Sequence, residues 1–343
     1  MRAFEGFLKG VDLGGWLSQC GNHYNEEHYS TFITEKDIET IAGWGADHVR
    51  LPIDYNILET EEGEFLESGF AHVDDCIRWC KKHGLKVVLD LHKTRGFVFD
   101  DESYVSFFEE KPLQDQFVDL WLEMNRRYGD MHDMLVFELL NEITSASMTE
   151  KWNEIADRTI KAIRKKNKDI RIIIGGIYNN SITGLSFLRA PQDENIVFTF
   201  HCYSPMIFTH QNAYWVAKMP KGYQLNYPGT AADYRKASFD VFGEDYDGEF
   251  AEYREEMMNE KFFEHIFQPA IQVAEKYNVP LYCGEYGVID HATPEDTVKW
   301  YRDIHAALDK YQIARSAWSY KKMDFGISDE RLAGVLPEII QCL

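Results

Sequence analysis

The chain has 343 residues, 45% of them hydrophobic and 14% aromatic, which suits one large folded domain or two ordinary ones and excludes a disordered protein. Its 36 basic and 57 acidic residues give a formal net charge of −21. That charge argues against a nucleic-acid binder, which needs a basic face, and disfavours an anionic membrane surface, so we expect neither as a partner.

Eight short apolar runs, each followed by polar residues, recur along the chain. Because the runs are continuous rather than alternating, they are typical of strands that helices cover on the outside. They lie at 10–16, 46–53, 85–92, 134–142, 171–176, 195–201, 280–287 and 315–321. Helical patterns fall between them, at 34–44, 68–82, 112–128, 150–167, 261–277 and 293–311. Pro269 lies inside the fifth helical pattern and is expected to kink it.

This alternation of strand and helix predicts an α/β fold, a (β/α)8 TIM barrel built as a single domain over residues 1–343. The rival fold is a doubly wound open sheet, which usually has a glycine-rich phosphate-binding turn after its first strand. Gly14 and Gly15, followed by Trp16, do not supply that turn. The sequence therefore favours the barrel.

The connection after the sixth predicted strand is much longer than the others. Its residues 203–255 contain 12 aromatic side chains, a density that marks them as an insertion rather than a loop. The insertion follows a strand end, so it is expected on the face where barrel active sites lie. We expect a lid or cleft wall that touches substrate, the alternative being a small subdomain packed around its own core.

No stretch approaches the roughly 20 apolar residues that span a bilayer. The first residues also lack the apolar run of a signal peptide. We therefore expect a cytoplasmic chain as it stands, or a secreted one if a leader preceding Met1 was removed. Six scattered cysteines without a CxxC pair predict free thiols and no metal site, and Cys76 and Cys80 suit a buried helix face. We expect a monomer.

Two glutamates lie at the ends of strands that face each other across a barrel mouth. Glu142 follows VFELLN at the end of the fourth strand, and Glu285 follows LYCG near the end of the seventh. Side chains at these two ends converge, so the carboxyl groups are expected to lie close together. One protonated and one ionised carboxyl at such a spacing can cleave a glycosidic bond, provided that their surroundings separate their pKa values.

Polar side chains end the neighbouring predicted strands and would support this pair. Arg50, in HVRLP, is expected to hold Glu285 ionised and oriented. Asn141 is expected to bond a sugar 2-hydroxyl. His92 and His201 close two further strands where sugar hydroxyls would lie. The structural alternatives are a cap outside the barrel for the arginine and the buried core for the histidines.

Aromatic residues at the same end of the barrel are candidates for stacking on sugar rings. Trp16 follows the first strand, Trp318 ends the eighth, and Trp215 lies in the insertion. For Trp318 and Trp215, the alternative is an ordinary place in a hydrophobic core. Tyr203 follows the sixth strand and is expected to donate a hydrogen bond to the nucleophile. Lys321 follows the eighth strand and is expected to bind a sugar hydroxyl.

The motifs HVRLP, LDLH, ELLNE, FHCYSP, CGEYG and AWSYK resemble those of glycoside hydrolase family 5, in the family's order across nearly the whole chain. The Gly-Gly-Trp start, GEYGVI and SAWSYKKMDF are similar to its clostridial endoglucanase C branch. The resemblance implies a retaining mechanism without metal or organic cofactor, with Glu142 as acid/base and Glu285 as nucleophile. The further site residues that it implies are Arg50, His92, Asn141, His201, Tyr203 and Trp318.

Among activities, the resemblance favours an endo-β-1,4-glucanase (cellulase) that acts on β-1,4-glucan and mixed-linkage β-glucan. A β-mannanase or glucomannanase, whose sugar differs at carbon 2, and an exo-β-1,3-glucanase are the alternatives. Outside this class we weigh a carbohydrate-binding protein without activity. A metal-dependent hydrolase would need clustered ligands, but His92 and His201 are single. A Schiff-base aldolase would need a buried lysine, and neither Lys93 nor Lys321 has an obvious apolar pocket.

Overall fold

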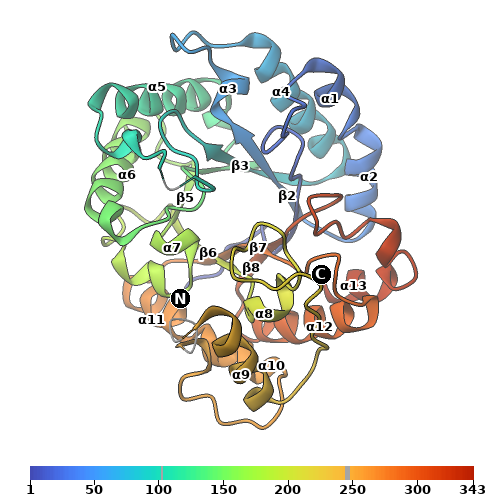
Figure 1. Ribbon diagram of the computed structural model, residues 1–343. Coiled ribbons are helices and arrows are strands. Elements are labelled where there is room, and N and C mark those ends of the chain that lie inside the picture. The colour runs from blue at the N-terminus through green and yellow to red at the C-terminus, as the bar shows by residue number, and fades with distance from the viewer. Residues whose placement is uncertain (102, 244–247) are drawn as a thin grey trace.

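The computed structural model describes residues 1–101, 103–243 and 248–343 (Figure 1). Within these residues, eight parallel strands close into a barrel in chain order, and β1 pairs with β8 to complete it. The strands are β1 (Lys9–Asp12), β2 (His48–Asp54), β3 (Lys86–Lys93), β4 (Leu135–Glu138), β5 (Arg171–Gly175), β6 (Ile196–Cys202), β7 (Leu281–Tyr286) and β8 (Ala314–Ala317). The predicted TIM barrel is confirmed.

Helices surround this barrel (Figure 1). The longer ones are α2 (Glu35–Gly43), α4 (Glu67–His83), α5 (Lys111–Tyr128), α6 (Thr149–Arg164), α9 (Ala231–Phe242), α10 (Glu260–Ile266), α11 (Gln268–Tyr277), α12 (Pro294–Lys310) and α13 (Leu336–Cys342). Shorter pieces are α1 (Glu26–Thr31), α3 (Tyr55–Leu58), α7 (Ile177–Asn180) and α8 (Met206–Thr209). Single 3-10 turns are η1 (Ser106–Phe108), η2 (Gly129–Met131), η3 (Ala146–Met148), η4 (Thr183–Phe187) and η6 (Glu330–Leu332). Among the described residues, none of the helices combines the length and the apolar character needed to cross a membrane.

The predicted helices are all present, with small shifts at their ends. The expected kink near Pro269 is present as an interruption at the single residue Phe267, where α10 ends at Ile266 and α11 begins at Gln268. Pro269 lies in the first turn of α11, where a helix needs no N–H donor. Cys76 and Cys80 are buried on α4, and all six cysteines are free, as predicted.

Alternate residues of the strands point into the barrel and stack in layers. The lowest layer is apolar apart from His48, which lies 2.9 Å from the hydroxyl of Tyr282, and Phe4 and Phe7 from the N-terminal segment close it from below. Its strand residues are Val88, Val136, Ile173, Val197, Tyr282 and Ala314. Two residues further along, the middle layer is polar and fully buried, with Arg50, Asp90, Glu138, Thr199 and Ser316. The next step along the same strands reaches His92 and His201, at the mouth. The fold thus places charge beneath the site and apolar packing beneath the charge.

The segment 203–255 connects β6 to α10 and contains α8 and α9, with α9 at the lower edge of the ring in Figure 1. Residues 244–247 of this expected insertion lie outside the described residues. Tyr227 anchors the segment, since its N–H donates to Asp296 and its hydroxyl to Asp303, both on α12. Other side chains of the segment are buried in the core, among them Phe208, Tyr234, Phe242, Phe250 and Tyr253. The segment therefore packs apolar residues of its own and also reaches the barrel mouth, as the site shows.

Candidate active site

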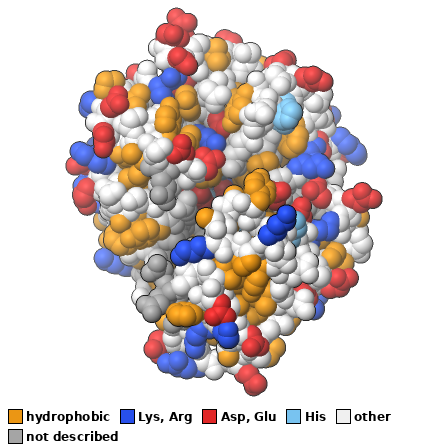
Figure 2. All heavy atoms as spheres, in the orientation of Figure 1, with side chains coloured by type: hydrophobic (Ala, Val, Ile, Leu, Met, Phe, Trp, Pro, Cys, Tyr) orange, Lys and Arg blue, Asp and Glu red, His pale blue; other side chains and the backbone are white. Residues whose placement is uncertain are grey.

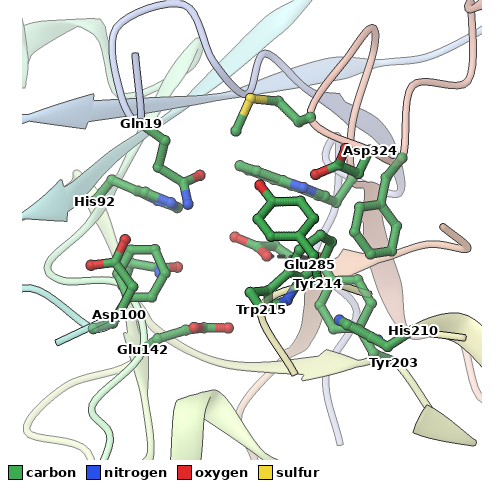
Figure 3. Close-up of a pocket in the computed structure, with 15 residues that line it drawn as sticks. Gln19, His92, Asp100, Glu142, Tyr203, His210, Tyr214, Trp215, Glu285 and Asp324 are labelled. Atoms are coloured by element: carbon green, nitrogen blue, oxygen red, sulfur yellow. Dashed lines mark hydrogen bonds between the residues drawn. The ribbon is translucent and has the colours of Figure 1, made fainter. Parts of the chain in front are cut away.

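A cleft of about 350 Å³ opens at the carboxyl end of the barrel (Figure 3). The face seen in Figure 2 is hollowed near its centre, where acidic side chains lie among apolar ones. Residues expected from the sequence that line the cleft are His92, Asn141, Glu142, Tyr203, Trp215, Glu285 and Trp318. The lining also includes residues that were not anticipated: Gln19, Phe99, Asp100, His210, Tyr214, Met323, Asp324 and Phe325.

The two predicted carboxyl groups face each other across this cleft (Figure 3). One oxygen of Glu142, one oxygen of Glu285 and a ring nitrogen of His201 all lie within 4.8 Å of one another. Glu285 comes from β7, whereas Glu142 lies in the loop that follows β4. The predicted fourth strand runs too far, because the backbone leaves the sheet after Glu138. Glu142 itself has φ +38°, a conformation that is uncommon for a residue other than glycine.

Glu285 is held by two donors, one on β2 and one directly after β6. Nη1 of Arg50 donates to its Oε1 at 2.8 Å, and the hydroxyl of Tyr203 donates to its Oε2 at 2.9 Å. The side chain is 7% exposed. Both contacts are the ones expected from the sequence, and together they fix the carboxylate in one orientation.

Arg50 is fully buried beneath the cleft and contacts several acidic groups at once. Its Nε donates to Glu138 at 2.7 Å, and its Nη2 lies 3.0 Å from Asp90. Nη2 also donates to Oδ1 of Asn141 at 2.9 Å. Despite this cation, burial raises the pKa of Asp90 to about 7 and raises the pKa of Glu138 as well. Arg50 thus orients both Glu285 and Asn141 from the barrel interior. The alternative, a cap outside the barrel, is wrong for this residue.

Glu142 has different surroundings from Glu285. Its Oε1 lies 2.8 Å from Nδ1 of His201, and its Oε2 accepts a hydrogen bond from Nδ2 of Asn179 at 3.2 Å. The side chain is 13% exposed. Burial raises the pKa of Glu142 to about 7, and the Asn179 hydrogen bond and the Arg50 charge only partly oppose that effect. Glu142 can therefore hold a proton near neutral pH.

The two histidines expected from the sequence, His92 and His201, are neutral. Burial lowers the pKa of His92 to about 3 and that of His201 to about 4. Nδ1 of His92 lies 2.6 Å from Asp90, so its other ring nitrogen is left for the cleft, toward which the ring points in Figure 3. Neutral rings suit hydrogen bonding to uncharged hydroxyl groups.

The expectation that Trp16 stacks on a sugar is wrong, because this residue is fully buried and does not line the cleft. Gly15, with φ +77°, turns the chain directly before it. The indole then packs against Trp79 of α4 and donates to the carbonyl of Tyr29 of α1. It belongs to the shell between the barrel and its first helices.

Trp318 and Trp215 are placed at the cleft, as expected. The Trp318 ring lies parallel to that of His92, with centroids 5.7 Å apart. It also packs on Gly14, where a Cβ atom would come within 2.7 Å of the indole. Gly14 thus gives the ring the space it needs. Trp215 is 44% exposed beside Tyr214, and both come from the segment that follows β6.

The structure does not place Lys321 in the lining of the cleft, so it gives no support to the expected contact with a sugar hydroxyl. Its Nζ is bound to Asp37 of α2 at 3.1 Å and lies over the ring of Phe32. The chain turns after Lys321 through left-handed residues 322–324, and this turn brings Met323 and Asp324 to the cleft instead.

Glu142, His201 and Glu285 also have the spacing of a metal site. However, their carboxylates already accept hydrogen bonds from Arg50, Tyr203 and Asn179. The positive charge of Arg50, 2.8 Å from Oε1 of Glu285, would repel a divalent cation bound there. The donor set thus suits proton transfer and covalent chemistry better than metal binding.

A TIM barrel with two close carboxyl groups in a cleft at its carboxyl end, one of them set to carry a proton, defines a glycoside hydrolase. Residues 12–324 match the model of a family described as cellulase (glycosyl hydrolase family 5). The chain belongs to glycoside hydrolase family 5 and is of the endoglucanase type.

Similar proteins cover nearly the whole chain. It is 42% identical to cellodextrinase A of Ruminococcus flavefaciens, over 93% of this chain and 87% of that protein. It is 40% identical to endoglucanase C of Acetivibrio thermocellus, over 98% of both. The crystal structure of endoglucanase Cel5A from Thermotoga maritima superposes with a TM-score of 0.76 at 25% identity, over 98% of this chain and 97% of that one.

Proposed function

We propose that the protein is a retaining endo-β-1,4-glucanase that hydrolyses β-1,4-glucan and mixed-linkage β-glucan by double displacement. Glu142 acts as acid/base and Glu285 as nucleophile. The observation that carries the proposal is the approach of their oxygens to within 4.8 Å. Retaining enzymes place the two carboxyl groups about 5–5.5 Å apart, whereas inverting enzymes leave about 6.5–9.5 Å for a water molecule.

In the first step, a carboxylate oxygen of Glu285 attacks the anomeric carbon. The bond from this carbon to the leaving oxygen breaks, and Glu142 gives its proton to that oxygen. In the second step, Glu142 takes a proton from water as the water oxygen attacks the same carbon and releases Glu285. Arg50 and Tyr203 keep the attacking carboxylate oriented in both steps.

The cleft offers groups suited to a neutral sugar chain. Trp318 and Trp215 present flat apolar faces, and the neutral His92 ring offers a polar edge. Within the described residues, Nδ2 of Asn141 is buried without a hydrogen-bond partner, while its Oδ1 is occupied by Arg50. This leaves one fixed donor for a sugar hydroxyl. The names of the similar proteins, a cellodextrinase and an endoglucanase, support β-1,4-linked glucose as that sugar.

Reducing-sugar release and viscosity on a substrate panel test the activity. The panel contains carboxymethylcellulose, barley β-glucan, glucomannan, mannan, xylan and laminarin, with Glu285→Gln as the inactive control. We expect release from the first two with a rapid fall in viscosity. Release from mannan alone or laminarin alone would replace the proposal with the mannanase or exo-β-1,3-glucanase alternative. Binding without release from any substrate would indicate a carbohydrate-binding protein.

Chemical rescue tests the two assigned roles. Glu285→Ala should lose turnover, and azide should restore activity on an activated glycoside with a product of inverted configuration. Glu142→Ala should slow substrates with poor leaving groups far more than activated ones. Equal losses on both substrate types, or no rescue of a folded Glu285→Ala, would contradict the assignment.

A further inference from the structure

The turn that follows β5 has an unusual backbone. Tyr178 and Asn179 have φ/ψ of 57°/51° and 55°/51°, and Asn180 has φ 52°. Three consecutive left-handed residues other than glycine persist only where the surrounding structure holds them. Asparagine tolerates this conformation better than most residues, so the sequence IYNN at 177–180 is compatible with the turn.

Two hydrogen bonds join this turn to the segment that carries Glu142. The backbone N–H of Asn179 donates to the carbonyl of Ile143 at 2.9 Å. The side-chain Nδ2 of the same residue donates to Oε2 of Glu142 at 3.2 Å. The backbone bond to Ile143 fixes the position of the turn. From that position, the side chain of Asn179 holds one oxygen of the Glu142 carboxyl group.

The next residue of the turn reaches the other oxygen through His201. Asn180 is fully buried, and its Nδ2 lies 3.4 Å from Nε2 of His201. The imidazole is neutral, so only one of its nitrogens carries a hydrogen. An amide donor at Nε2 leaves that hydrogen on Nδ1, which then donates to Oε1 of Glu142 at 2.8 Å. Each carboxyl oxygen thus has one donor that depends on the same turn.

We propose that Asn179 is a positioning residue that orients Glu142 and favours its ionised form, and that Asn180 supports it by setting the tautomer of His201. The inference rests on the proposed function, in which Glu142 must release a proton and later regain it. Burial alone would make this carboxyl a weak acid. Donors on both oxygens stabilise the anion left after proton transfer and keep the acid strength near neutrality.

Other charged or titratable groups also face Glu142, Asp90 of β3 among them, and none of them is itself changed by a substitution at Asn179. His201 comes from β6, Arg50 from β2 and Glu285 from β7, and Asp100 lies in the loop after β3. Tyr203 lines the same cleft. Because these groups are common to the wild type and the variants, a change in the titration of Glu142 reports the bond that was removed.

The direct test is the pKa of Glu142, measured by carbon-13 NMR of its carboxyl group and assigned by loss of the signal in Glu142→Gln. Asn179→Gly keeps the left-handed backbone accessible but removes the amide, and Asn179→Asp keeps the shape but adds a negative charge. We expect the pKa to rise by about 0.5–1 pH unit in the glycine variant and further in the aspartate variant. Asn278→Gly, at another left-handed asparagine that caps α11, should leave it unchanged.

Kinetics separates this inference from the function on which it rests. The alkaline limb of kcat/KM on cello-oligosaccharides should move upward with the measured pKa in both Asn179 variants. A pKa of Glu142 that stays at the wild-type value in both would overturn the role of Asn179, whatever the kinetics. A raised pKa with an unmoved alkaline limb would support the contact and contradict the acid role of Glu142.

Discussion

Nη1 of Arg50 lies 2.8 Å from Oε1 of Glu285, joining β2 to β7 across the interior of the barrel. Arg50 is fully buried, and Asp90 and Glu138 contact the same guanidinium. The cleft is thus built on a charge cluster whose single arginine faces several acidic groups. Arg50 thus both orients the Glu285 carboxylate and compensates buried negative charge.

Removing the charge of Arg50 should destabilise the fold strongly. Arg50→Met keeps much of the volume but leaves the buried carboxyls uncompensated, and we expect a loss of about 3–5 kcal/mol in the free energy of unfolding. Chemical denaturation measures this loss. Arg78→Met, which breaks the exposed pair with Asp75, is the matched control and should cost no more than about 1 kcal/mol. Similar losses of unfolding free energy in the two variants would mean that the charge of Arg50 does not stabilise the buried carboxyl groups.

Turnover should fall in the alkaline range as Glu142 loses its proton. Its pKa is raised to about 7, and the acid must be protonated to assist a poor leaving group. We therefore expect kcat/KM on cello-oligosaccharides to decline above about pH 7. In Glu142→Gln, assayed with an activated aryl glycoside, this decline should vanish. A decline that persisted in that variant would assign it to another group.

The same raised pKa has a consequence for stability. The pKa of Glu142 rises from its ordinary 4.5 to about 7 in the folded state. The folded protein therefore loses stability as the pH rises from 4.5 to about 7. Glu142→Gln cannot ionise and should be more stable than the wild type at pH 8, by about 1–3 kcal/mol. At pH 4 the carboxyl is protonated in both states, and this advantage should disappear. A difference between the two proteins that did not change with pH would contradict the burial of a charged Glu142.

Trp215 and Trp16 should respond in opposite ways to truncation. Trp215→Ala removes a half-exposed ring of the cleft wall, so KM for cellohexaose should rise severalfold with little change in Tm. Trp16→Ala removes a buried ring and should cost about 3–5 kcal/mol of stability. Phe239→Ala, exposed on α9 and away from the cleft lining, controls for general effects in the segment after β6 and should leave KM unchanged. A KM unaffected by Trp215→Ala would remove this residue from substrate binding.

The elements that form the site could be predicted because the sequence pattern is strong where the barrel is regular. Continuous apolar runs identified each strand, and the order of strands in a closed barrel brings their carboxyl ends together. Glu142, Glu285 and Arg50 were therefore recognisable as a group before any distance was known. The strand ends were harder to predict. Strand β4 ends at Glu138, and the positive φ of Glu142 is not visible in the pattern of apolar residues.

What the sequence did not reveal depends on packing between distant segments. The burial of Trp16 follows from the turn at Gly15 and from contacts with α1 and α4. Lys321 forms an ion pair with Asp37, a residue distant in the sequence. Asn179 lies in a turn whose conformation is fixed by its bond to Ile143, so its approach to Glu142 is a tertiary feature.

The configuration of the first product tests the central claim most directly. Proton NMR can follow the anomeric signals of the sugar released from cello-oligosaccharides, before mutarotation mixes them. A double displacement through Glu285 predicts that the β-anomer appears first and the α-anomer grows only as mutarotation proceeds. Initial formation of the α-anomer would show that water attacks the sugar directly, and would contradict a covalent role for Glu285.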